Sequence, residues 1–333
     1  MDHNINSKNK KHKLNSLSQA PLELVAFVVL LSLCFASALS SIAIASSVSK
    51  NKNTSSAHTD MQNAQSSLPS EVPARTIDGY TLIQMTEDDL SKGNLVLINH
   101  DYSFNRDVSS ELSQIKDHNS KAYGIASVNM LVNSEVIAPL DAMLTNFYNK
   151  TAINSIYVSS CYRSYEEQDF LHKQEIINLG ETEAKNWVAQ AGHSEHHSGY
   201  AVDIALMDEN GVTTEYNGSG QFSMLNKSAP DYGFIVRYNE NKKDITGIYY
   251  EPWHFRYIGL PHAKICTELN MCYEEYIDCL RRYTPDGEHL KYNHNNTDYE
   301  IYFCEGTNVY VPQNSEYTVS GNNVDGFIVT VKK

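Results

Sequence analysis

The chain has 333 residues, of which 41% are hydrophobic, and it contains 22 tyrosines. This length and composition are typical of a globular protein with one well-filled domain and a smaller module, and they exclude a disordered chain. The formal net charge is −14, so the chain lacks the basic surface that nucleic-acid binding requires. We interpret the acidity as a contribution to solubility and expect no nucleic-acid partner.

The N-terminal segment has a different character from the rest of the chain. Residues 1–23 are basic, and residues 24–49 contain no charged side chain. The uncharged stretch exceeds the roughly 20 residues that a membrane-spanning helix needs. Its basic flank predicts a single-pass anchor with residues 1–23 in the cytoplasm and the rest of the protein outside. Two alternatives stay open, namely a secretory signal cleaved after Ala45 and a buried core helix.

The chain after the apolar stretch divides into three parts by composition. Residues 50–78 are rich in Ser, Asn, Thr and Gln, which predicts a flexible linker. Residues 79–284 are predicted to form the main domain. In chain order, its patterns predict a strand at residues 95–99, a helix at 134–149, a strand at 155–161, helices at 164–180 and 181–191, strands at 200–206 and 247–250, and a helix at 262–282.

Residues 285–333 are rich in β-forming residues, with Gly and Asn at the predicted turns. We predict that they form a small β-module, whose strands include residues 299–303 and 327–331. Five cysteines lie outside the apolar N-terminal stretch, and none forms a close CxxC pair. We interpret these cysteines as buried core residues and leave a disulfide at Cys304 open.

Two short motifs concentrate metal-binding residue types. The first, SEHHSGYAVD at residues 194–203, contains His196 and Asp203; the second, EPWH, begins at Glu251 and ends at His254. Two imidazoles and a carboxylate suit a catalytic zinc ion, which takes three protein ligands and leaves its fourth position to water. The remaining carboxylate, Glu251, is then available as a general base.

These residue types alone do not select one histidine from the first motif. His193, His196 and His197 are close together, and His193 and His197 have the spacing of helical zinc ligands. No HExxH motif is present, however, and Gly192 and Gly199 make a helix at this point improbable. Clustered loop histidines are more often surface residues than ligands, so the choice stays open at this level.

Three ordered motifs resemble those of the VanY-type D-alanyl-D-alanine carboxypeptidases, in the zinc peptidase family that includes the VanX-type dipeptidases. The resemblance covers roughly residues 80 to 282. The family's SxHxxGxAxD, ExxH and YRS…Q patterns match at Ser194, His196, Gly199, Ala201, Asp203, Glu251, His254, Tyr162, Arg163, Ser164 and Gln168. The resemblance implies one zinc ion per chain, held by His196, Asp203 and His254, with Glu251 as the catalytic base.

The resemblance also assigns residues to the substrate. Arg163 carries a planar fork of donors that suits a tetrahedral oxyanion or a carboxylate, although a surface arginine at a strand end is the structural alternative. Ser194, Gln168 and Tyr238 are the further candidate substrate contacts. Their structural alternatives are a loop turn for Ser194, an exposed helix position for Gln168 and ordinary packing for Tyr238.

We therefore expect an α+β fold with a central, mainly antiparallel sheet, packed helices, a zinc site at the sheet edge and the C-terminal β-module. The predicted activity is zinc-dependent removal of the terminal D-Ala from D-Ala-D-Ala ends of peptidoglycan stem peptides. Two alternatives remain, an L,D-carboxypeptidase on tetrapeptide stems and a non-catalytic cell-wall-binding protein. The second is disfavoured because all three ligands, the base and the arginine are present. The β-module lies outside the minimal catalytic family, and its role is open.

Overall fold

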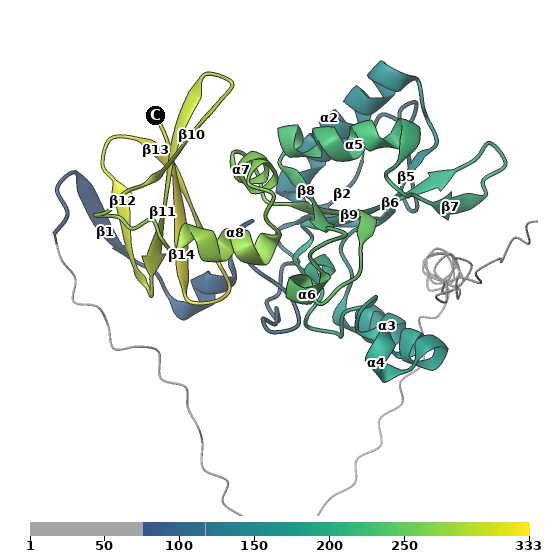
Figure 1. Cartoon of the computed structure of the whole chain (residues 1–333), viewed down its shortest axis with the longest axis horizontal. Coiled ribbons are helices and arrows are strands. Elements are labelled where there is room, and N and C mark those ends of the chain that lie inside the picture. Colours follow the sequence, from purple (N-terminus) through teal and green to yellow (C-terminus); the bar gives the residue numbers. More distant parts are fainter. Residues whose placement is uncertain (1–75, 117) are drawn as a thin grey trace, which may run out of the picture.

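The computed structural model describes residues 76–116 and 118–333 (Figure 1). The predicted basic segment and membrane anchor, and all but the last residues of the predicted linker, lie outside these ranges. Within them, no helix is both long and apolar enough to cross a bilayer. Membrane anchoring and export therefore stay predictions.

A central sheet forms the body of the main domain. Its strands are arranged in the order β3-β5-β6-β9-β8, with β7 paired beside β6. All of its pairings are antiparallel except that of β3 with β5, which confirms the predicted mainly antiparallel sheet. The strand bounds are β3 (Gly124–Ile125), β5 (Ile156–Ser160), β6 (Ala201–Met207), β7 (Thr213–Glu215), β8 (Phe234–Tyr238) and β9 (Glu251–Tyr257).

Helix α2 (Ser134–Thr151) covers one face of this sheet together with α5 (Ser223–Ser228) (Figure 1). The helix predicted at residues 134–149 is thus confirmed. The side chain of Asn133 caps its first turn, and its apolar face is buried in a core shared with the strands. Helices α3 (Tyr165–Leu179) and α4 (Glu181–Ala184) lie apart from α2, toward the other side of the sheet (Figure 1).

The C-terminal β-module is confirmed and includes a strand from the N-terminal side of the chain. A four-stranded sheet has the order β10-β11-β14-β13, and β12 pairs with β1 (Tyr80–Gln84). In Figure 1, β1 lies beside the yellow C-terminal strands. The module's own strands are β10 (Leu290–His294), β11 (Thr297–Glu305), β12 (Asn308–Pro312), β13 (Glu316–Gly321) and β14 (Gly326–Lys332).

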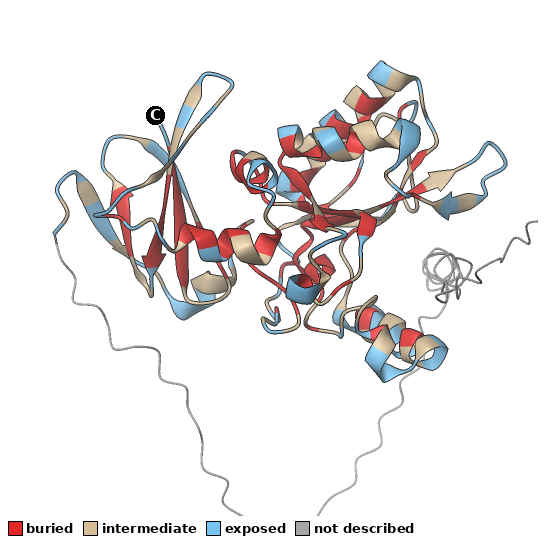
Figure 2. Ribbon diagram, in the orientation of Figure 1, coloured by how far each residue is buried: buried red, intermediate tan, exposed pale blue. Residues whose placement is uncertain are grey.

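Two helices, α7 (His262–Glu268) and α8 (Tyr273–Leu280), lie between the central sheet and the β-module (Figure 1). One hydrophobic core contains Ile235 of the central sheet, Ile277 of α8 and Ile328 of the module. Figure 2 shows buried residues along the strands of both sheets and along α8. The two lobes therefore share a core instead of meeting at a polar surface.

The predicted single helix at residues 262–282 is wrong, because it is two helices. The chain between α7 and α8 turns at Asn270, whose φ of 52° lies in the left-handed region. The predicted helix at residues 181–191 is also too long, since α4 ends at Ala184. In both cases a helical apolar pattern continues beyond the point where local turns end the helix.

Two predicted strands are wrong as well. Residues 95–99 are buried but form no strand, because their backbone groups form hydrogen bonds with side chains and loops and not with a neighbouring strand. The N–H of Leu95, for example, donates to Ser320 Oγ at 2.9 Å. Residues 247–250 follow the short helix α6 (Lys243–Thr246), and the strand begins only at residue 251. Pro252 is tolerated there because the β8–β9 register shifts beside it, and such irregularities accept proline.

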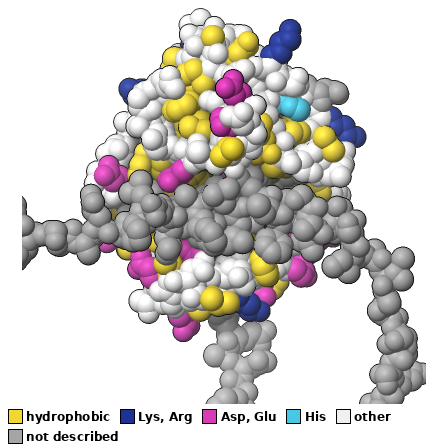
Figure 3. Space-filling model, turned by 90° about the vertical axis from the view of Figure 1, so that its right-hand side faces the viewer, with side chains coloured by type: hydrophobic (Ala, Val, Ile, Leu, Met, Phe, Trp, Pro, Cys, Tyr) yellow, Lys and Arg dark blue, Asp and Glu magenta, His cyan; other side chains and the backbone are white. Residues whose placement is uncertain are grey.

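All five described cysteines are free and buried, so Cys304 forms no disulfide. On the face shown in Figure 3, hydrophobic and acidic side chains are interspersed, and the Lys and Arg side chains lie apart from one another.

The remaining small sheet pairs β2 (Leu112–Gln114) with β4 (Leu131–Asn133).

Candidate metal centre

The two motifs meet where β6 and β9 pair. Asp203 on β6 is the cross-strand partner of His254 on β9, so the two side chains are neighbours on one face of the sheet. His196 comes from a 3₁₀ turn (Glu195–Ser198) directly before β6. Gly199 ends this turn with φ of 73°, and a Cβ there would lie 2.8 Å from the backbone nitrogen of Asn133. Glycine is therefore required for the turn to deliver His196 beside Asp203.

The donor atoms of these three residues converge. His196 Nε2 lies 3.1 Å from Asp203 Oδ2, and His254 Nδ1 lies 3.0 Å from Asp203 Oδ1. One donor atom from each residue falls within 4.8 Å of the others. Donors that share a tetrahedral zinc ion at about 2.0–2.2 Å are separated by roughly 3.4 Å. Two imidazole nitrogens and a carboxylate oxygen in this arrangement fit a catalytic zinc ion.

The second nitrogen of each imidazole is also held. His196 Nδ1 lies against the carbonyl oxygen of Cys161, and His254 Nε2 lies 3.3 Å from Glu195 Oε2. These partners fix the ring orientations, so that His196 presents Nε2 and His254 presents Nδ1 to the cluster. Holding the outer nitrogen in this way is typical of metal-ligating histidines.

Burial and charge set the protonation of the cluster. Burial and the Arg163 guanidinium lower the pKa of His196 to about 4. Burial opposes protonation of His254 too, but its contacts with Asp203 and Glu195 prevail and raise its pKa to about 9. Burial disfavours the charged form of Asp203, yet the two histidines hold its pKa far below its usual range. His196 and Asp203 are thus in their ligating forms at neutral pH, and His254 must release a proton when a metal binds.

Glu251 lies beside the cluster without being one of its three donors. It is the first residue of β9, and its Oε2 is 3.9 Å from His254 Nδ1. Burial raises its pKa to about 8, opposed by the charge of His254. A carboxyl group that lies next to the cluster and has its pKa close to neutral pH has the properties of a general base.

Arg163 approaches the cluster from the end of β5. One terminal nitrogen lies 3.6 Å from Asp203 Oδ2 and donates to Ser160 Oγ at 2.9 Å, and the other donates to Gln168 Oε1 at 2.7 Å. Gln168 is 1% exposed, and its Nε2 donates to the carbonyl of Ala189. Both polar atoms of Gln168 thus contact the protein, and this residue orients the arginine.

The remaining candidate residues, Ser194, Tyr238 and His197, differ in how they lie relative to the metal cluster. Ser194 Oγ accepts from the backbone N–H of His196 at 3.4 Å and caps the turn. The Tyr238 ring lies 5.1 Å from that of His254, so this side chain packs directly against the cluster. His197 faces away from it, with Nδ1 bonded to the carbonyl of Arg163 at 2.8 Å.

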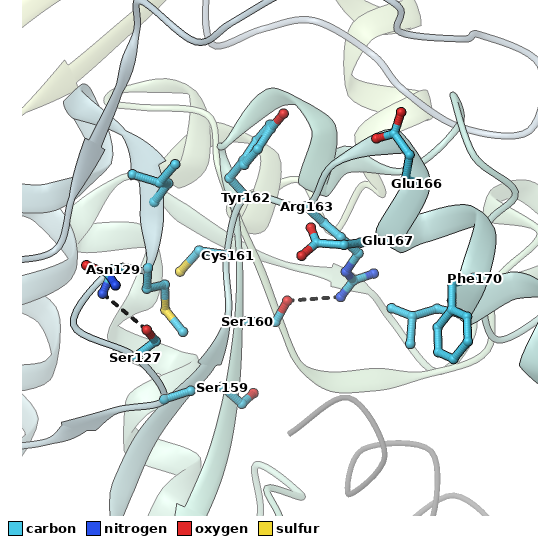
Figure 4. Close-up of a pocket in the computed structure, with 14 residues that line it drawn as sticks. Ser127, Asn129, Ser159, Ser160, Cys161, Tyr162, Arg163, Glu166, Glu167 and Phe170 are labelled. Carbon is cyan, nitrogen blue, oxygen red and sulfur yellow. Dashed lines mark hydrogen bonds between the residues drawn. The ribbon is translucent and has the colours of Figure 1, made fainter. Parts of the chain in front are cut away.

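A pocket of about 660 Å³ opens next to Arg163 (Figure 4). Ser160 and Arg163 form one part of its lining, and Glu166 and Phe170 of α3 extend the lining beyond Arg163. Ser127 and the neighbouring loop close the opposite side. Because Arg163 also contacts Asp203, the pocket adjoins the metal cluster.

Sequence reasoning did not identify Glu195, Arg237 and Glu274, which lie behind His254. Glu195 occupies a variable position of the first motif, and the other two residues lie in no motif. The one signal available in the sequence was a charged residue within an otherwise apolar strand pattern, as at Arg237 in FIVRY. It indicates that a partner exists, but not which residue the partner is.

Comparison with known proteins gives consistent results. Residues 129–260 match the family model described as VanY, D-alanyl-D-alanine carboxypeptidase. A D-alanyl-D-alanine carboxypeptidase of Enterococcus faecium is 33% identical over 253 residues, covering 74% of this chain and 78% of that protein. The bifunctional D-Ala-D-Ala dipeptidase and carboxypeptidase VanXYC of Enterococcus gallinarum is 40% identical over 122 residues, covering 36% of this chain and 64% of its own.

A solved structure resembles this protein over most of the chain. The D,D-dipeptidase VanXYg, crystallised with a D-Ala-D-Ala phosphinate analogue, superposes with a TM-score of 0.67 at 32% identity. The match covers 76% of this chain and 99% of that chain. Both the local motifs and the overall architecture are therefore similar to proteins that act on D-Ala-D-Ala.

Proposed function

Because the chain belongs to the VanY family of D-alanyl-D-alanine carboxypeptidases and is a hydrolase, we propose that it is a zinc-dependent D,D-carboxypeptidase. Its substrate is the D-Ala-D-Ala end of a peptidoglycan stem peptide, from which it releases the terminal D-Ala. The observation that carries this proposal is the convergence of His196, Asp203 and His254 within 4.8 Å, with Glu251 beside them. Export through residues 24–49, as predicted from the sequence, would bring the enzyme to this substrate.

Each residue has a defined task in this reaction. His196 Nε2, a carboxylate oxygen of Asp203 and His254 Nδ1 would hold one zinc ion per chain. When bound, zinc lowers the pKa of a coordinated water to about 7 and polarises the scissile carbonyl. Glu251 accepts the proton of the attacking water and delivers it to the amine of the departing D-Ala.

Arg163 supplies positive charge at the same place. Gln168 and Ser160 hold its guanidinium at 2.7 and 2.9 Å, so its planar group is oriented before substrate arrives. In that position it can donate to the developing oxyanion or to the terminal carboxylate. The adjoining pocket of about 660 Å³ has room for the peptide that precedes the scissile bond.

The D,D-bond is favoured over the L,D-bond by what must fit next to the cluster. A penultimate D-Ala presents a methyl group, whereas a tetrapeptide stem places a long diamino-acid side chain there. Tyr238 is packed against the His254 ring, and if its ring borders the substrate there, it would favour the smaller group. The relatives reported above are named for D-Ala-D-Ala substrates.

The test offers pentapeptide and tetrapeptide stems to the purified full chain, with and without a chelator, and follows D-Ala release by mass spectrometry. We expect chelator-sensitive release from the pentapeptide, restored by zinc, and no release by the His196→Ala variant. Preference for the tetrapeptide would reassign the enzyme as an L,D-carboxypeptidase. Failure to cleave either stem with zinc bound would favour a wall-binding protein.

A further inference from the structure

A buried carboxylate lies directly behind one of the metal-binding histidines. The Glu195 side chain is completely buried, and its two oxygens have different partners. Oε2 lies 3.3 Å from His254 Nε2, and Oε1 accepts from Arg237 Nε at 2.7 Å. Glu195 therefore connects His254 to a fully buried arginine on β8.

Arg237 is in turn held by helix α8. Its two terminal nitrogens donate to the carboxylate of Glu274 at 2.9 and 2.6 Å, a bidentate pair. Asn99 Nδ2 donates to the same carboxylate at 3.1 Å. A continuous series of contacts thus leads from His254 through Glu195 and Arg237 to α8, which lies beyond the residues 129–260 that match the family model.

The geometry also argues against charge compensation as the sole role of Glu195. Arg237 already has a bidentate carboxylate partner in Glu274. Glu195 uses only one oxygen for the arginine, and its second oxygen faces the outer nitrogen of His254. An acceptor at Nε2 favours the tautomer that carries its proton there, which leaves the Nδ1 lone pair for the metal.

We propose that Glu195 is a positioning residue for His254, and that α8 fixes Glu195 through Glu274 and Arg237. The affinity of the site for zinc is then set partly by a helix outside the matched segment. This inference rests on the proposed function, because it assumes that His254 is a metal ligand.

The experiment measures zinc affinity of the full chain by competition with a chromogenic chelator, and records the visible absorption spectrum of the cobalt-substituted protein. Glu195→Gln removes the charge but keeps the size, and it leaves Arg237 paired with Glu274. The matched control is Glu275→Gln on the same helix, because Glu275 pairs with Lys242 and not with Arg237. Thermal unfolding with chelator present verifies that each variant is folded.

We expect Glu195→Gln to weaken zinc binding about 10- to 100-fold, the range typical of lost outer partners of ligating histidines, and to shift the cobalt bands. Glu274→Gln should give a smaller loss, and Glu275→Gln should match the wild type. Wild-type affinity and cobalt spectrum in a folded Glu195→Gln protein would overturn the role of Glu195. Should that variant fail to fold, equal affinities of Glu274→Gln and Glu275→Gln would overturn the link to α8.

These measurements are separate from the test of the activity. A wild-type protein that binds zinc but releases no D-Ala would refute the proposed carboxypeptidase and leave the affinity ratios intact. A wild-type protein that releases D-Ala, with a Glu195→Gln variant of unchanged affinity, would refute only the positioning role.

Discussion

His262 should make the junction between the two lobes sensitive to acid. This histidine begins α7, and its ring nitrogens contact Tyr276 Oη at 2.7 Å and Thr330 Oγ1 at 2.8 Å. Thr330 belongs to β14 of the C-terminal module, so the ring joins both lobes. Only one neutral imidazole nitrogen carries a proton, and a second proton would place an unpaired charge in the core.

The size of the effect follows from the pKa of His262. Burial lowers this pKa from 6.5 to about 3. Below pH 6.5 the unfolded chain binds a proton that the folded chain does not, so the free energy of unfolding decreases as the pH falls toward 3. At about 1.4 kcal/mol per pH unit, the loss attributable to His262 is about 2 kcal/mol between pH 8 and pH 5.

The measurement compares urea unfolding of the wild type and His262→Gln at pH 8, 7, 6 and 5. A chelator is present throughout, because zinc binding is itself pH-dependent. Other titrating groups are common to both proteins and cancel in the difference. We expect the stability advantage of the wild type at pH 8 to shrink by about 2 kcal/mol at pH 5. Parallel pH profiles would refute the assignment of the acid sensitivity to His262.

Three further variants test individual residues of the site. Glu251→Ala should retain zinc in a metal analysis but lose roughly 10²- to 10⁴-fold in kcat, as expected for a removed base; near-normal turnover would remove Glu251 from the mechanism. Arg163→Lys should lower kcat/KM steeply in the same D-Ala assay, because lysine lacks the planar fork of donors with which arginine bonds both Gln168 and Ser160. Gly199→Ala should lower the unfolding free energy by about 1–3 kcal/mol in urea, since its φ of 73° and the nearby Asn133 backbone disfavour a Cβ.

The candidate ligands could be predicted because their chemistry is written in short segments. His196 and Asp203 lie only seven residues apart, His196 on a turn and Asp203 on the strand that follows it. The residues alone left three histidines equivalent, and the family pattern chose among them. The structure adds the physical reason: His196 Nδ1 is held by the Cys161 carbonyl, whereas His197 is turned toward the Arg163 carbonyl.

Regular elements were predictable where one face of an element is consistently buried. The helix at residues 134–149 has five buried apolar residues at helical spacing. The run at residues 95–99 is equally buried, yet it forms no strand because Ser320 and Asn322 supply its backbone partners from the far end of the chain. A local apolar pattern reports burial, and it does not report which groups satisfy the backbone.

The same limitation explains why the support of the metal centre was not predicted. Glu195 and Arg237 are 42 residues apart, and Arg237 and Glu274 are 37 residues apart. A second buried arginine, Arg256 on β9, donates to backbone carbonyls of Asn94 and Val96. Partners at such separations come together only in the assembled fold. Removing either partner of a buried ion pair lowers the stability of the protein, because it leaves the other charge buried without compensation. Chain segments on both sides of residues 129–260 therefore support the strands that carry the ligands. A minimal domain cut to that match would leave Arg237 without Glu274 and Arg256 without the carbonyls of Asn94 and Val96.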